Sequence, residues 1–160
     1  KVANIMSTLK IFSWAAVITW MAFIFLLSHQ PAEESRELSQ QVTEVVVDKF
    51  EKITPVKYVY FRELHHFLRK SAHFFAYFVL GILVINAIRR CGNRENNNLG
   101  IALCICILYA ISDEIHQLFV SGRSSEFRDI IIDSLGASAG TSLYQIACRQ
   151  ANRLVVIKRK

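Results

Sequence analysis

The sequence lacks the spacing signatures of the common catalytic and nucleotide-binding sites. It contains no H-E-x-x-H, no G-x-S-x-G and no P-loop motif. It also has no internal repeat, no low-complexity tract, and no contiguous basic face with interleaved aromatic residues, which nucleic-acid binding would require. The formal net charge of +6 therefore does not indicate a nucleic-acid partner, and we expect none.

The four cysteines do not suggest a disulfide framework. Cys104 and Cys106 stand in the middle of an apolar block, and Cys91 and Cys148 adjoin basic segments that we assign below to the reducing side of a membrane. A Cys-x-Cys pair in an apolar helix is most often a packing feature. We assign no metal or redox role to these thiols, and we expect the protein to hold no cofactor and no metal.

Apolar residues make up 52% of the 160 residues and gather into four blocks, at about 11–27, 72–88, 99–115 and 130–146. A helix needs about 17 to 25 such residues to cross a bilayer. The first block is free of charge, and it is longer than the apolar core of about 7 to 15 residues in a cleaved signal peptide, so we expect it to stay as an anchor. We predict an all-α fold, a four-span transmembrane helical bundle in one membrane-embedded domain over residues 1–160.

Basic residues are distributed unequally between the segments that flank these blocks. Residues 1–10, 89–98 and 147–160 carry ten Lys or Arg against one acid, Glu95. Because cytoplasmic segments of membrane proteins carry an excess of Lys and Arg, we predict that both termini face the cytoplasm. The basic C-terminal tail is also suited to contact anionic lipid.

The segment Ser28–Ser71, between the first two blocks, is then external. Apolar residues recur in it at helical spacing among charged ones, which predicts an amphipathic helix on the outer leaflet or folded over the bundle. Its apolar face comprises Val42, Val45, Val46, Phe50 and Ile53. A further helix is predicted to begin at Val56 and to continue into the second span.

The fourth block is the least apolar, and it contains the small-residue sequence GASAG from Gly136 to Gly140. Small residues let helix backbones approach closely where lipid provides no hydrophobic drive, so we expect this helix to lie inside the bundle. Alternatively, the same surface forms a homodimer through Gly136 and Gly140. The small-residue pattern can also be a coincidence of composition.

Polar residues in the last three blocks recur at helical spacing, so that each set shares one helix face. The first set is Arg69, His73 and Tyr77; the second is Tyr109, Asp113 and either His116 or Gln117; the third is Asp129, Asp133, Gly136 and Gly140. With the predicted topology, all three sets lie in the outer third of their helices.

These groups therefore occupy one depth in the membrane. An unpaired charge in hydrocarbon costs about 2.5 to 3.5 kcal/mol on insertion scales, so such groups turn inward and pair. The cations available for pairing are Arg69, Lys70, Arg123 and Arg128, and the acids are Asp113, Glu114, Asp129 and Asp133. We predict one polar pocket that opens outward.

The stretches RKSAHFFAYFVLG, DEIHQLFVSGRSSEFRDIIIDSLGASAG and LSHQPAEES resemble the VanZ family of small bacterial membrane proteins. The resemblance covers Leu27 to Gly140 and is carried by Lys70, His73, Tyr77, Asp113, Glu114, Gln117, Arg123 and Asp129 in this order. Asp133 departs from it, because family members more often have Asn there. The resemblance implies a multi-pass protein of the bacterial cytoplasmic membrane, and the founding member is associated with resistance to the glycopeptide teicoplanin.

Three roles are open for the predicted pocket. It can be a structural ion-pair network, or it can bind an external ligand whose phosphate or carboxylate pairs with the cations, such as an anionic lipid, a peptidoglycan precursor or a glycopeptide. It can also be the site of an enzyme acting on a lipid-linked or cell-wall substrate, in which histidines and acids transfer protons. The candidate residues are Arg69, Lys70, His73, Tyr77, Asp113, Glu114, His116, Gln117, Arg123, Asp129 and Asp133.

Among these roles we favour a membrane protein that binds an envelope ligand or modulates how it is handled. No residue can be assigned a catalytic function, because the catalytic signatures are absent. A transporter or channel is a further class of function, but the chain has no inverted repeat or broken helix pair of the transporter kind.

Overall fold

The computed structural model describes residues 2–29, 59–92, 98–120 and 126–157. All regular structure in these ranges is α-helical, as predicted. The helices are α1 (Val2–His29), α3 (Val59–Arg90), α4 (Asn98–Gln117) and α5 (Phe127–Ile157). The predicted amphipathic helix around residues 42–53, the predicted helix start at Val56 and the loop holding Arg123 lie outside the described residues.

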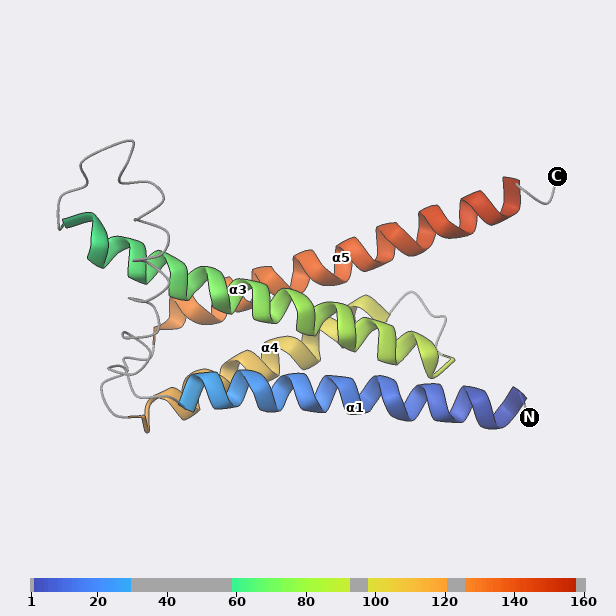
Figure 1. The fold of residues 1–160 in the computed structure, drawn as a ribbon, viewed down its shortest axis with the longest axis horizontal. Helices are drawn as coiled ribbons and strands as arrows, with labels where there is room; N and C mark the ends of the chain where they lie inside the picture. The colour runs from blue at the N-terminus through green and yellow to red at the C-terminus, as the bar shows by residue number, and fades with distance from the viewer. Residues whose placement is uncertain (1, 30–58, 93–97, 121–125, 158–160) are drawn as a thin grey trace.

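The four helices lie lengthwise in one bundle (Figure 1). α1 and α4 run in one direction, and α3 and α5 run in the other, so that both chain ends lie at the same end of the bundle. We call the opposite end the site end: it holds the last residues of α1 and α4 and the first residues of α5. Both termini on one side is the arrangement that the predicted topology requires.

Three helical segments are long and apolar enough to cross a membrane: Met6–His29, Arg69–Arg90 and Asn98–Gln117. They contain the predicted spans at about 11–27, 72–88 and 99–115. The fourth predicted span, at about 130–146, lies within α5 but is not among these segments. The crossing of the membrane by α5 therefore stays a prediction.

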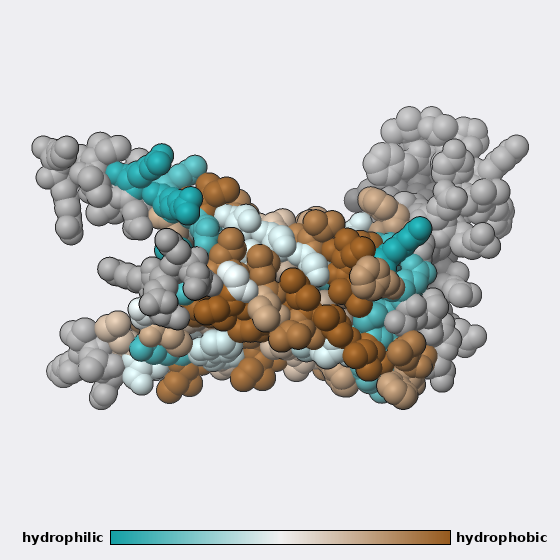
Figure 2. Space-filling model, turned by 180° about the vertical axis from the view of Figure 1, so that it is seen from behind, coloured by the Kyte–Doolittle hydropathy of each residue, from teal (hydrophilic) through white to brown (hydrophobic). Residues whose placement is uncertain are grey.

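Large apolar side chains point outward from the bundle. Figure 2 shows apolar residues across the middle of one face and hydrophilic residues toward both ends. Exposed examples come from all four helices and include Phe12, Phe75, Leu108 and Leu135. Hydrocarbon surrounding the middle of the bundle would accommodate this surface, whereas water would not.

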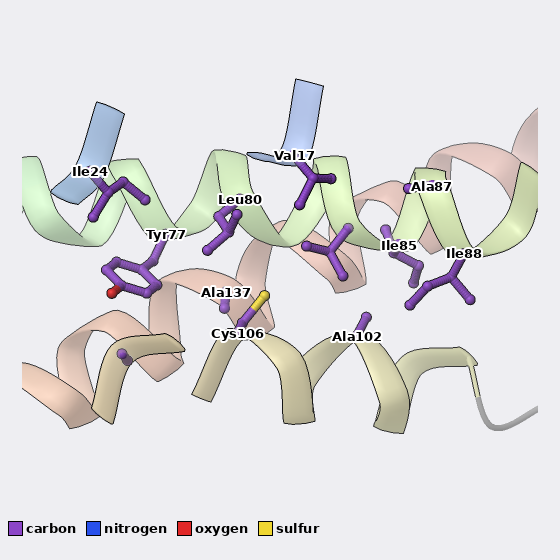
Figure 3. Packing of buried hydrophobic residues seen from close by; sticks show 12 residues of the cluster. Val17, Ile24, Tyr77, Leu80, Ile85, Ala87, Ile88, Ala102, Cys106 and Ala137 are labelled. Atoms are coloured by element: carbon purple, nitrogen blue, oxygen red, sulfur yellow. The ribbon is translucent and has the colours of Figure 1, made fainter. Parts of the chain in front are cut away.

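The buried core lies between the helices and contains few large side chains (Figure 3). Its residues lie on the inward faces of the helices, and α3 contributes more of them than any other helix. The buried members include Val17, Ile24, Tyr77, Leu80, Val84, Ile85, Ala102, Cys106, Ala110 and Ala137. Small residues on α4 and α5 let these helices approach α3.

The backbones of α3 and α5 approach each other closely at two glycines of α5. A β-carbon added to Gly136 would overlap the Phe74 carbonyl oxygen, and one added to Gly140 would overlap that of Phe78. The expected placement of this helix inside the bundle through its small residues is confirmed. Both glycines are used within the chain, and a homodimer through them stays a prediction that this contact does not support.

Several polar groups along the helices are hydrogen-bonded to backbone carbonyls. Ser134, Ser138 and Thr141 each donate a hydrogen bond to the carbonyl one turn earlier on α5, at 2.7, 2.7 and 2.9 Å. Trp20 Nε1 donates to the Ala76 carbonyl at 2.9 Å and thereby links α1 to α3. These bonds reduce the cost of carrying polar groups through an apolar environment.

The cysteines are all free, which agrees with the expectation of no disulfide framework. Cys106 is buried in the core, and Cys104 is exposed on the apolar exterior. Beyond α3, Gly92 adopts a φ of +91°, a conformation that ends the helix and that L side chains rarely adopt.

Gly140→Leu is expected to destabilise the bundle, because the new side chain would overlap the Phe78 backbone and force α3 and α5 apart. Overpacking of this kind typically costs about 1 to 3 kcal/mol. Denaturant-induced unfolding in detergent, followed by circular dichroism, measures the effect. Gly100→Ala is the control, since a β-carbon there meets no neighbour. Equal stability of Gly140→Leu and the unmodified protein would contradict the close α3–α5 contact.

Candidate functional site

Polar and ionisable side chains from all four helices converge at the site end of the bundle. Six of them form what we call the polar cluster, and they come from α1, α3, α4 and α5. The polar cluster consists of Ser28, His73, Tyr77, Asp113, Gln117 and Asp133. All are buried except His73, which is half-buried.

Asp113 on α4 connects the polar cluster to α1. Its Oδ2 accepts a hydrogen bond from Ser28 Oγ at 2.8 Å and another from Gln117 Nε2 at 3.3 Å. Gln117 Nε2 also lies 3.5 Å from Ser28 Oγ. With only 3% of its surface exposed, this carboxylate is held in a fixed position by donors from two helices.

His73 on α3 faces Asp133 on α5. His73 Nδ1 lies 3.7 Å from Asp133 Oδ2, which is longer than a hydrogen bond. Asp133 is 2% exposed, and its Oδ1 has no hydrogen-bond partner among the described residues. The two side chains therefore face each other without satisfying each other's hydrogen-bonding capacity.

Tyr77 lies one turn further into the bundle than His73. Its side chain is fully buried, at 0% exposure, and its hydroxyl has no hydrogen-bond partner among the described residues. The charges of Asp113 and Asp133 lie within electrostatic range of this hydroxyl. The Tyr77 hydroxyl thus lies near the two buried carboxylates but has no hydrogen-bond partner among the described residues.

One ring nitrogen of His73 and one carboxylate oxygen each of Asp113 and Asp133 lie within 4.8 Å of one another. Imidazole and carboxylate are the groups that commonly bind divalent metal ions in proteins. The sequence analysis expected no metal. The grouping is not visible as a motif, because its members stand on three different helices.

Lys70 forms a second layer of contacts, nearer the solvent, which we call the rim. Its Nζ lies 3.2 Å from Glu126 Oε2 and 3.5 Å from Asp129 Oδ1. Glu114 Oε1 accepts a hydrogen bond from the backbone nitrogen of Glu126, so both α3 and α4 are fastened to the start of α5. The predicted pairing of cations with acids is thus present at Lys70 and Asp129.

The other candidates that the structure describes do not join the polar cluster or the rim. The ring of His116 stacks on Phe25 with a centroid distance of 4.3 Å, and its Nε2 lies 3.2 Å from His29 Nδ1. Of the two alternatives on this helix, Gln117 is therefore the residue that contacts Asp113. Arg69 and Arg128 form no ion pair with the described residues, and Arg128 is exposed. Arg123 lies outside the described residues.

Sequence reasoning missed two residues that the structure brings to this end of the bundle. Ser28 was not a candidate, although a serine directly after the charge-free apolar block is a usable signal. Glu126 was not a candidate either, and its position immediately before α5 was the available indication.

The polar cluster differs chemically from the rim. The rim consists of ion pairs and a backbone contact, and its role in joining helices explains it. In the polar cluster, two buried carboxylates, an imidazole and a phenol lie close together, while Tyr77 Oη and Asp133 Oδ1 lack hydrogen-bond partners in the described part of the chain. Such a set can bind a ligand or a cation, or transfer protons.

Comparison with curated proteins and with solved structures gives no match to this chain. A family model described as VanZ/LLP1 matches residues 12–148, which include every residue of the polar cluster and the rim. The match extends over much more than half of the chain and agrees with the resemblance seen in the sequence. On this evidence the chain belongs to the VanZ/LLP1 family of membrane proteins.

Proposed function

We propose that this protein binds the polar head of an anionic envelope ligand at the external end of its helix bundle. A lipid-linked peptidoglycan precursor or a glycopeptide antibiotic is the ligand class. The observation that carries the proposal is the polar cluster, in which buried side chains from four helices meet at one end of an otherwise apolar bundle.

A purely structural role does not account for this cluster. A buried polar atom without a hydrogen bond typically costs about 1 to 3 kcal/mol. Tyr77 Oη, Gln117 Oε1 and Asp133 Oδ1 are all in this state among the described residues. A network selected to hold helices together would satisfy these atoms or replace them with apolar groups.

The position of the cluster favours a ligand that lies in the membrane boundary. The cluster lies toward one end of the three helical segments that are long and apolar enough to cross a membrane. Lys70 stands at its rim with 22% of its side chain exposed. Lipid-linked cell-wall intermediates carry phosphate groups at this depth. The ammonium of Lys70 is suited to attract such a group.

The proposed topology places the site end outside the cell. In this arrangement α5 is the fourth span, both termini are cytoplasmic, and the membrane is the bacterial cytoplasmic membrane. The support is the excess of Lys and Arg in residues 1–10, 89–98 and 147–160, together with the position of both chain ends at one end of the bundle.

A second candidate function is catalysis on a lipid-linked or cell-wall substrate. The His73–Asp133 pair favours it, because a carboxylate facing a ring nitrogen can orient an imidazole that accepts and returns a proton. Tyr77 would be a further proton donor in the same cluster.

Labelling in intact cells tests the topology. In a chain whose other cysteines are replaced, a cysteine at Phe127→Cys, where the side chain is exposed at the site end, is expected to react with a membrane-impermeant maleimide. In a second chain that keeps the native exposed Cys91, at the opposite end, and no other cysteine, Cys91 is expected to react only after permeabilisation. The reverse pattern would contradict the proposed orientation.

Teicoplanin susceptibility tests the binding function. Expression of the unmodified chain in a susceptible host is expected to raise the inhibitory concentration several-fold. Lys70→Gln and Asp133→Asn, at the same membrane level, are expected to remove most of this effect, because each removes a charge from the rim or the polar cluster. Arg149→Gln, an exposed position far from the site, is the control. Full retention of the effect by both site variants would contradict the proposal.

Turnover by purified protein tests the catalytic alternative. Protein in detergent is incubated with lipid-linked peptidoglycan intermediates, with and without divalent metal, and products are sought by mass spectrometry. If a product forms, His73→Gln is expected to slow its formation by about 10²- to 10⁴-fold, the usual contribution of a general acid or base. The absence of any product across the substrates would reject the catalytic function and leave the binding function standing.

A further inference from the structure

We propose that His73, Asp113 and Asp133 form a binding site for one divalent transition-metal ion, Zn²⁺ or Mn²⁺. Each residue comes from a different helix, α3, α4 or α5, so the ion would join three helices at the site end. No residue spacing in the sequence indicated this site.

The geometry is close to that of a metal centre. The candidate ligand atoms lie within 4.8 Å of one another, and His73 Nδ1 and Asp133 Oδ2 are 3.7 Å apart. Bonds of about 2.1 Å from a central ion place its ligand atoms at most about 4.2 Å apart. Small side-chain rotations therefore suffice to bring all three atoms into contact with one ion.

The charges favour a cation at this position. Asp113 and Asp133 are 3% and 2% exposed, and two carboxylates buried so close together repel each other strongly in a medium of low polarity. The described lysine at this end, Lys70, pairs instead with Glu126 and Asp129. A divalent ion would balance the charges of both aspartates.

A second, independent observation is the state of the neighbouring polar atoms. The hydroxyl of Tyr77 is fully buried and lacks a hydrogen-bond partner among the described residues. Gln117, at 1% exposure, also has a buried side-chain oxygen without such a partner. Both atoms are suited to bind water on the ion, which would resolve their unsatisfied state.

The surroundings also resemble the second layer of a metal site. Ser28 and Gln117 donate hydrogen bonds to Asp113 and hold its carboxylate in position. Ligating carboxylates are commonly oriented by donors of this kind. One imidazole with two carboxylates suits Zn²⁺ or Mn²⁺ better than Ca²⁺ or Mg²⁺, which prefer oxygen ligands alone.

A bound ion would also explain how an acidic site receives an anionic ligand. The described residues here include more acids than bases, and this excess of negative charge would repel a phosphate. The acids are Asp113, Glu114, Glu126, Asp129 and Asp133, and the bases are Arg69, Lys70 and Arg128. The ion would neutralise two of the acids and leave coordination positions open to a phosphate or carboxylate oxygen. This last step rests on the proposed function, whereas binding of the ion itself does not.

Metal content of the purified full chain tests the site. Protein in detergent is stripped with chelator, dialysed against Zn²⁺ or Mn²⁺, and its bound metal is counted by mass spectrometry. Co²⁺ is used in parallel, because its visible absorption reports the coordinating groups. Asp133→Asn and His73→Gln are compared with Asp129→Asn and His116→Gln, which alter the same residue types on the same or a neighbouring helix outside the trio. Thermal unfolding confirms that each variant is folded.

We expect one ion per unmodified chain, retained by Asp129→Asn and His116→Gln. Asp133→Asn and His73→Gln are expected to weaken binding by more than about 100-fold, since loss of outer-layer partners alone costs about 10- to 100-fold. Absence of stoichiometric metal in the unmodified chain, or equal affinity of Asp133→Asn and Asp129→Asn, would overturn the site.

No envelope ligand is present in this measurement, so its failure is distinguishable from failure of the proposed function. Metal binding without any effect on teicoplanin susceptibility supports the metal site and rejects the ligand role. A different outcome is that the unmodified chain binds no metal, while Asp133→Asn no longer raises the inhibitory concentration of teicoplanin. That outcome rejects the metal site and supports the ligand role.

Discussion

The close approach of α3 and α5 places the ionisable groups of the site opposite one another. Gly136 and Gly140 lie directly against the backbone of α3 at Phe74 and Phe78, where no larger side chain fits. Asp133, three residues before Gly136, faces His73, which directly precedes Phe74. About one turn earlier on each helix, Asp129 faces Lys70. The small residues that let two helices pack closely thus also determine the distances between the charged ones.

The second half of the site depends on α1 and α4. Asp113 is held by Ser28 and Gln117, and the ring of Tyr77 lies 6.1 Å from that of Tyr109 on α4. Because Ser28 comes from α1, whereas Asp113 and Gln117 stand on α4 and Asp133 on α5, this arrangement of the two aspartates requires the assembled bundle. The polar cluster is therefore a property of the four-helix arrangement and of no single helix.

The apolar surface of the bundle raises the energetic cost of unpaired polar groups inside it. Large apolar side chains are exposed on all four helices, and on the face shown in Figure 2 apolar residues predominate across the middle and hydrophilic residues lie toward both ends. In such a medium, polar atoms without partners are costly, and charges interact strongly. Ser134, Ser138 and Thr141 meet this constraint through hydrogen bonds to their own helix. The atoms of the polar cluster that lack hydrogen-bond partners among the described residues do not meet this constraint. In this respect the polar cluster differs from ordinary helix packing.

The sequence by itself determined the helical class, three apolar segments long enough to cross a membrane, the family and the helix faces that carry polar residues. These features follow from hydrophobic run lengths, residue order and helical periodicity, which are local. It also indicated the inward use of the small residues around Gly136, because close helix packing in lipid requires them.

Only the tertiary structure decided which of these polar residues meet. Periodicity left His116 and Gln117 as equal alternatives on α4, and the choice of Gln117 depends on where α1 presents Ser28. The grouping of His73, Asp113 and Asp133 depends on the rotation and depth of three helices relative to one another. Those quantities are set by packing between residues far apart in the chain, and helical spacing within one segment contains no information about them.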